Sequence, residues 1–243
     1  MTLFKNLQQL QMAYPEHIQS VSPTEISWHD GTKMPIGALS SPLRQLDNPT
    51  LADQLMQAEY PIGQLPDHTL QHLTKDPGRI RYSPFFSKMY GDTAATVEQQ
   101  LTTIDWLSDL FSNKYPLKVT TINDVDKKLL AISKELTQLP TAFHKFVSDP
   151  PDTFFWRTIA GTQRLSPHSF GIAIDINVDH SHYWQWDLQK AGKIVAEDTP
   201  LTYQNQIPWE IVLIFEKYGF IWGGKWHHYD TMHFEYRPEF FYK

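Results

Sequence analysis

The 243-residue sequence predicts an α+β fold, in which a small antiparallel sheet carries helices on one side. Two observations predict this class. Several stretches place apolar residues at the spacing of a helix, and shorter stretches alternate apolar and polar residues with the period of a strand. Turn signals containing proline or glycine separate these stretches, and no internal repeat or low-complexity segment interrupts them.

We expect residues 1–116 to form an N-terminal elaboration of helices and irregular structure. Its first helix, over about residues 3–13, is indicated by four apolar residues near helical spacing: Leu3, Leu7, Leu10 and Met12. Pro15 ends this helix. Residues 22–66 are rich in proline and polar residues, which predicts a surface segment with short strands. An apolar cluster follows, which we expect to pack on the main domain: Phe85, Phe86, Met89 and Tyr90.

Three further helices are predicted, over residues 95–111, 125–139 and 208–218. The first of them carries one apolar stripe: Val97, Leu101, Ile104 and Leu107. The third has Pro208 in its first turn, and Gly219 suits its C-terminal cap.

Strands are predicted in the last part of the chain. The clearest one alternates three isoleucines with smaller or polar residues: Ile172, Ala173, Ile174, Asp175 and Ile176. The isoleucines then face the core, and Asp175 points to the opposite face. A strand over residues 154–157 is expected to lead towards this segment, and residues 180–186 are expected to be a loop. The last strand places His233 and Glu235 on one face.

Charge and composition exclude several classes of function. The net charge is −6 and no basic run is present, which argues against a nucleic acid partner. The chain has no cysteine, so it has neither disulfides nor thiolate metal ligands. It has no G-x-S-x-G motif, no phosphate-binding glycine motif and no apolar run long enough for a membrane span.

Two motifs carry the chemistry: Ser166-Pro-His168-Ser-Phe-Gly171-Ile-Ala-Ile-Asp175, and Asp230-Thr-Met-His233 near the C-terminus. His168, Asp175 and His233 can supply three nitrogen and oxygen ligands to one metal ion. Such ligands suit zinc, and three of them leave a tetrahedral position open for water, as a hydrolytic site requires. Alone, each of these residues is more often an ordinary hydrogen-bonded group.

These motifs resemble the zinc D-alanyl-D-alanine carboxypeptidase family, which includes vancomycin-resistance carboxypeptidases and dipeptidases and phage endolysins that cut L-alanyl-D-glutamate. The pattern S-x-H-x-x-G-x-A-x-D matches at every fixed position: Ser166, His168, Gly171, Ala173 and Asp175. The second motif matches [D/E]-x-x-H. The resemblance extends from about Leu117 onward and implies a zinc peptidase domain over residues 117–243. It also implies a fold similar to that of the Hedgehog signalling domain, whose main role is binding.

The resemblance implies roles for four further residues. Asp230 is the expected general base, three residues before a ligand, although it could instead only orient a ligand imidazole; many relatives have Glu here. In the family an arginine stabilises the oxyanion, and we expect Arg157 to have this role. Arg164 is the alternative for the same role, or it binds a substrate carboxylate instead. Ser166 is expected to position the substrate, or only to shape its turn.

Neighbouring histidines are weaker candidates. His227 and His228 lie near the second motif, but His228 is five residues before His233, a spacing that does not suit a shared face of a strand or helix. We expect them to contact substrate, support a ligand or lie in a polar loop. His180 and His182 are expected to be solvated loop residues.

The expected function is zinc-dependent hydrolysis of a peptide bond in the stem peptide of peptidoglycan. We favour a D-alanyl-D-alanine carboxypeptidase over an L-alanyl-D-glutamate endopeptidase, with a non-catalytic cell-wall peptide-binding module and a cytosolic dipeptidase as alternatives. The N-terminal residues lack the apolar stretch of a signal peptide. The resemblance nevertheless favours a periplasmic or secreted protein, and we expect a monomer.

Overall fold

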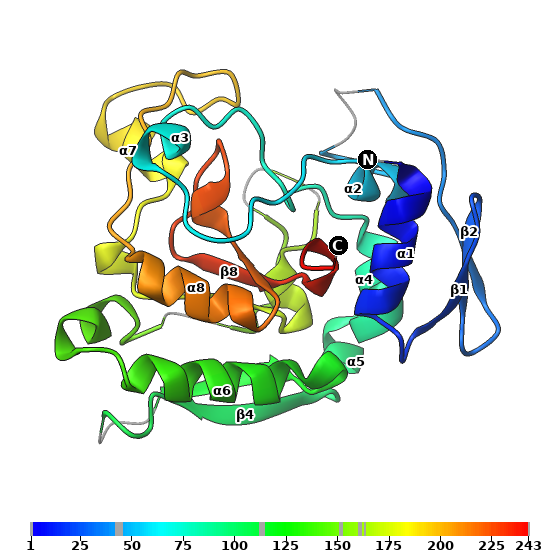
Figure 1. The fold of residues 1–243 in the computed structure, drawn as a ribbon, viewed down its shortest axis with the longest axis horizontal. Helices are drawn as coiled ribbons and strands as arrows, with labels where there is room; N and C mark the ends of the chain where they lie inside the picture. Colours follow the sequence, from blue (N-terminus) through cyan, green and yellow to red (C-terminus); the bar gives the residue numbers. More distant parts are fainter. Residues whose placement is uncertain are drawn as a thin grey trace.

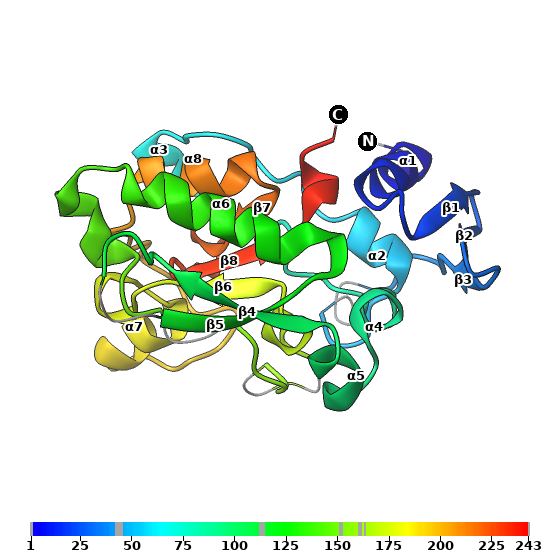
Figure 2. The ribbon, with the colours of Figure 1, turned by 90° about the horizontal axis from the view of Figure 1, so that it is seen from below.

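The computed structural model describes residues 2–41, 46–111, 115–150, 153–159, 162 and 164–242. These residues form an α+β fold with small antiparallel sheets and helices, which confirms the predicted class (Figure 1). Strands β1 (Ile18–Val21) and β2 (Glu25–Trp28) lie with helix α1 (Leu3–Ala13) at one end of the molecule, and helix α7 (Trp184–Lys190) lies at the other (Figures 1 and 2). No helix in these ranges combines the length and the hydrophobicity needed to cross a membrane.

A three-stranded sheet near the C-terminus carries the site. Its order is β6 (Ala173–Asp175), β8 (His233–Tyr236) and β7 (Phe220–Trp222), and both pairs are antiparallel. Backbone pairing continues beyond β6, because Tyr236 N donates to Ile172 O and Ile176 N donates to Met232 O, both at 2.9 Å. The predicted alternation is confirmed: the side chains of Ile172, Ile174 and Ile176 are fully buried in the core.

Helix α8 (Trp209–Lys217) covers one face of this sheet, and helix α6 (Val125–Thr137) lies beside α8, as Figure 2 shows. Helix α8 packs on β7, and Phe215 stacks on Phe234 with ring centroids 3.9 Å apart. Helix α6 lies against α8 and against a second sheet. Both helices were expected from their apolar stripes, and both predictions are confirmed within two residues.

The second sheet corrects one prediction. Residues 95–111 do not form one helix: α5 (Ala94–Glu98) is short, and β4 (Leu101–Trp106) pairs with β5 (Tyr115–Thr120). Alternate residues of β4, Ile104 and Trp106, are buried, which is the period of a strand, and Trp106 was not part of the predicted helical stripe. Antiparallel pairing with β5, the next strand along the chain, decided between the two periods.

The N-terminal half consists of short elements that pack on the rest of the chain. Helix α1 (Leu3–Ala13) has the predicted bounds and precedes a three-stranded meander: β1 (Ile18–Val21), β2 (Glu25–Trp28) and β3 (Lys33–Pro35). Three helices follow it: α2 (Leu51–Leu55), α3 (Asp67–Leu70) and α4 (Ser83–Tyr90). The predicted apolar cluster lies on α4 and is buried, and Phe86 stacks on Phe170 of the first motif.

Two smaller predictions around the site were wrong. Residues 154–157 are not a strand; next to them only Thr158 and Leu165 form an isolated bridge. Residues 180–186 are not all loop, because α7 (Trp184–Lys190) begins within them. Short 3₁₀ helices complete the described elements: Ile122–Asp124, Thr141–Phe146, Pro167–Phe170, Val178–His180, Gly223–Lys225 and Pro238–Phe240.

Candidate metal centre

A tight turn positions His168. The Ser166 hydroxyl accepts a hydrogen bond from His168 N at the start of the 3₁₀ helix Pro167–Phe170. Gly171 ends that helix with φ of +65°, and a Cβ there would lie 2.8 Å from a Leu101 methyl and 3.0 Å from Thr120 N. Glycine is therefore required on two grounds, the backbone conformation and the close approach to β5.

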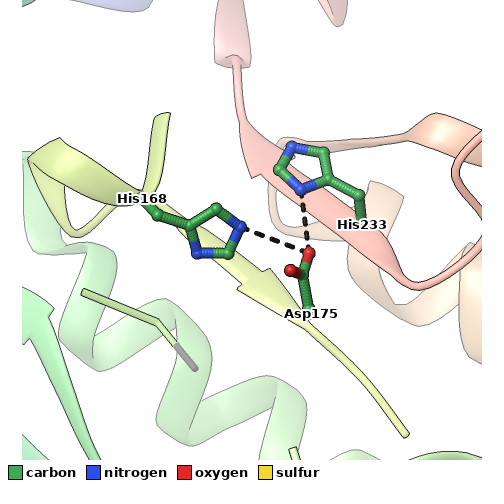
Figure 3. Close-up of side chains that lie close together, drawn as sticks. All are labelled: His168, Asp175 and His233. Atoms are coloured by element: carbon green, nitrogen blue, oxygen red, sulfur yellow. Dashed lines mark hydrogen bonds and ion pairs between the residues drawn. The ribbon is translucent and has the colours of Figure 1, made fainter. Parts of the chain in front are cut away.

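The three predicted ligands meet in space. Asp175 at the end of β6 and His233 at the start of β8 are paired across the sheet. His233 Nδ1 lies 2.9 Å and His168 Nε2 3.2 Å from Asp175 Oδ1, as Figure 3 shows. One ligand atom from each of the three residues lies within 4.8 Å of the others. The sequence motifs therefore describe one site.

The hydrogen bonds around this group suit a metal ion. His168 Nδ1 lies 3.1 Å from Thr153 O, so it can donate there and leave Nε2 with a lone pair facing Asp175. That buried Nε2 has no hydrogen-bond partner among the described residues. On His233 the roles of the nitrogens are reversed: Nδ1 faces Asp175, and Nε2 lies at an ion-pair distance of 3.5 Å from Glu235 Oε2 without a hydrogen bond among the described residues. Metal-binding histidines typically have a protein oxygen next to their second nitrogen.

Asp230 lies beside the three ligands without belonging to them. Its amide donates to Gly223 O at 3.0 Å, and one oxygen of its carboxyl group is buried without a hydrogen-bond partner in the part of the chain that the structure describes. Burial and the negative charge of Asp175 raise the pKa of Asp230 to about 7. A carboxyl group with such a pKa can accept and release a proton near neutral pH.

The ligands open onto a cavity of about 310 Å³. Its walls include Tyr183 and Trp186 of the α7 region, and all seven residues selected from the sequence lie in its lining: Arg157, Arg164, Ser166, His168, Asp175, Asp230 and His233. The structure thus brings together every one of them. Arg79 and Arg81, from the N-terminal half, also line the cavity and were not expected. Their only signal in the sequence was an Arg-x-Arg pair after a turn.

The two predicted arginines differ in their surroundings. Arg157 is exposed at the cavity wall. Arg164 is only 9% exposed, and its Nε and Nη1 atoms have no hydrogen-bond partner among the described residues. Burial and the positive charges of Arg81 and Arg79 lower the pKa of Arg164 to about 10. Even so, its guanidinium stays charged at neutral pH and is available to an anion.

The remaining histidines do not join the ligand group. His228 lies in the cavity wall, with Nδ1 2.7 Å from Asp76 Oδ2 and Nε2 3.0 Å from Glu197 O. Burial lowers its pKa, but the bond to Asp76 outweighs this and leaves the pKa above its usual value. His227 Nδ1 lies 2.6 Å from Leu73 O, within hydrogen-bonding distance. The prediction that His182 is a solvated loop residue was wrong, because it is mostly buried and pairs with Asp187.

The α+β fold and this constellation define a class of site: two histidines and a carboxylate able to hold a metal ion, with a second carboxylate and cations around an open cavity. Residues 160–236 match the model of the D-alanyl-D-alanine carboxypeptidase family. The match contains both motifs, confirms the family resemblance and supports a peptidase. It leaves out Arg157 and the N-terminal arginines. No curated protein and no solved structure gave a significant match.

Proposed function

We propose that the protein is a zinc-dependent peptidase of peptidoglycan, and within that class a D-alanyl-D-alanine carboxypeptidase. The observation that carries the proposal is the meeting of His168, Asp175 and His233 at a cavity that Asp230 also lines. The family match supports the same class of reaction. Two imidazoles and one carboxylate suit zinc and leave room for a fourth ligand.

In the proposed mechanism, each residue around the metal ligands has a separate role in hydrolysis. Zinc held by the three ligands supplies Lewis-acid activation of water and of the peptide carbonyl. Asp230 accepts the proton of the attacking water and passes it to the leaving amine, a role that its pKa near neutrality suits. Arg157 stabilises the negative charge that develops on the carbonyl oxygen. Ser166 and the aromatic wall place the stem peptide.

Arg164 favours a carboxypeptidase over an endopeptidase. An enzyme that removes the last residue has to recognise a free terminal carboxylate, and a fixed guanidinium can bind both of its oxygens. Arg164 is buried in the cavity wall and lacks partners for two of its nitrogens among the described residues. An endopeptidase has no terminal carboxylate to bind at this point.

A digest of purified muropeptides tests the function. Muropeptides ending in D-Ala-D-Ala should lose one terminal D-alanine, which mass spectrometry detects. Cleavage between L-alanine and D-glutamate with the D-alanyl end intact would establish an endopeptidase and keep the metal mechanism. A protein that holds zinc but cleaves no muropeptide would instead support a peptide-binding module.

The role of Arg164 has a separate test. Arg164→Ala should raise KM more than it lowers kcat, because the carboxylate contact is made equally in the ground state and the transition state. A substrate with a terminal carboxamide is the matched control, since it lacks the charge that Arg164 binds. The assignment is wrong if the substitution affects both substrates equally.

The remaining parts of the proposal follow from the family. The substrate lies outside the inner membrane, so we propose a periplasmic or secreted monomer. We also propose that residues 117–243 are the catalytic domain and residues 1–116 an elaboration that contributes to its cavity.

A further inference from the structure

An extended segment of the N-terminal half runs along the cavity and is held from one side by two glutamines. Gln57 Oε1 accepts hydrogen bonds from Gly78 N at 2.7 Å and from Ile80 N at 3.3 Å. Gln54 Oε1 accepts one from Tyr82 N at 2.7 Å. Because side chains alternate along an extended chain, the residues between these anchors, Arg79 and Arg81, both reach the cavity.

The C-terminal part of the chain holds the same segment from the other side. Trp226 Nε1 donates to Pro77 O at 2.7 Å, and Arg237 Nη1 donates to Gly78 O at 2.8 Å. Gly78 has φ of +94°, and a Cβ there would lie 2.2 Å from the Ile221 Cδ1 atom. The close approach means that the backbone next to Arg81 has little freedom to shift.

Arg81 connects this segment to a proposed metal ligand. Its Nε lies 2.9 Å from both carboxylate oxygens of Glu235, and its Nη2 also contacts Oε2. Glu235 is fully buried, and its Oε2 is the oxygen that faces His233 Nε2. Arg81 also lies over the Trp226 ring, 5.8 Å from its centroid, and that ring packs against His233 with centroids 5.7 Å apart.

Arg81 is the main counter-charge of Glu235. The other cation nearby, Arg237, lies 3.4 Å from Glu235 Oε1 and makes its shorter bond, 2.7 Å, to Glu239. A buried carboxylate that loses its partner is drawn out of its position, since an unpaired charge is costly in the interior. The oxygen that lies 3.5 Å from the second nitrogen of His233 is then no longer held in place.

We infer that Arg81 is a positioning residue of the metal centre, which acts through Glu235 to hold the His233 ring with Nδ1 directed at the metal. The inference rests on the proposed metal-dependent function. It gives the N-terminal half, which lies outside the segment matching the family, a direct part in the site. The physical basis is that a carboxylate behind a ligand imidazole sets its tautomer and orientation.

Metal affinity tests the inference without relying on turnover. Arg81→Met and Glu235→Gln should each weaken zinc binding about 10- to 100-fold, the usual effect of losing such a support. The dissociation constant is measured by competition with a chromophoric chelator, and the absorption spectrum of the cobalt(II)-substituted protein reports on ligand geometry. Arg79→Met is the matched control: it removes the neighbouring arginine, which pairs with Asp76 and Glu197, and should leave zinc affinity unchanged.

Two further variants separate positioning from general damage to the fold. Arg81→Lys keeps a charge but not the forked contact, so its affinity should lie between those of the wild type and Arg81→Met. The double variant Arg81→Met with Glu235→Gln should bind zinc no more weakly than Glu235→Gln alone, because both act on the same imidazole. If Arg81→Met does not fold, the zinc affinity of Arg81→Lys tests the inference instead.

Wild-type zinc affinity and an unchanged cobalt spectrum in folded Arg81→Met, or in Arg81→Lys where Met does not fold, would overturn the inference. If muropeptides are still cleaved in that case, the proposed function is supported although the inference is wrong. If the variants bind zinc more weakly but the wild-type protein cleaves no muropeptide, the inference is supported and the proposed peptidase function is wrong. Absence of zinc binding by the wild type would overturn both.

Discussion

His233→Ala is expected to yield a folded protein without bound metal and without peptidase activity. The substitution removes Nδ1, one of three ligand atoms that lie within 4.8 Å of one another, and two remaining ligands hold zinc too weakly to survive purification. Elemental analysis of protein purified without added metal should show about one zinc per wild-type chain and almost none in the variant.

His228→Ala is the matched control for this experiment. His228 lines the same cavity and lies near His233 in sequence, but it is bound to Asp76 and Glu197 rather than to the ligand group. We expect this variant to retain its zinc. A metal content that His233→Ala leaves unaffected would refute the proposed ligand set.

Asp230→Asn is expected to retain zinc and fold but to lose about 10²- to 10⁴-fold in kcat, the usual contribution of a general base. The amide has nearly the shape of the carboxylate but cannot accept the proton of the attacking water. Turnover of a muropeptide by protein of verified zinc content measures the effect.

Asp230→Glu is the conservative comparison, because it keeps a proton acceptor and places the residue that many family members have at this position. It should retain much more activity than Asp230→Asn. Near-normal turnover by zinc-loaded Asp230→Asn would mean that Asp230 only supports the metal site.

The structure also explains which parts of the fold were predictable. Helices α1, α6 and α8 were expected nearly to their observed ends, because each has an apolar stripe bounded by proline or glycine. Residues 95–111 were misassigned because Val97, Leu101, Ile104 and Leu107 lie at helical spacing, whereas the strand buries Ile104 and Trp106. The pairing of β4 with β5, the next strand along the chain, distinguishes the two.

The three candidate metal ligands were predictable from the sequence alone. His168 lies in a turn next to a strand, Asp175 lies on the open face of that strand, and His233 lies on a second strand, so spacing and alternation within short segments predicted one site. The fold added charges that the motifs did not indicate, and it set which of the surrounding charges are buried. Arg79 and Arg81 come from a segment with no periodic pattern, and two side-chain nitrogens of the buried Arg164 have no hydrogen-bond partner among the described residues. Burial and charge pairing depend on contacts between segments far apart in the chain, and local patterns do not specify those contacts.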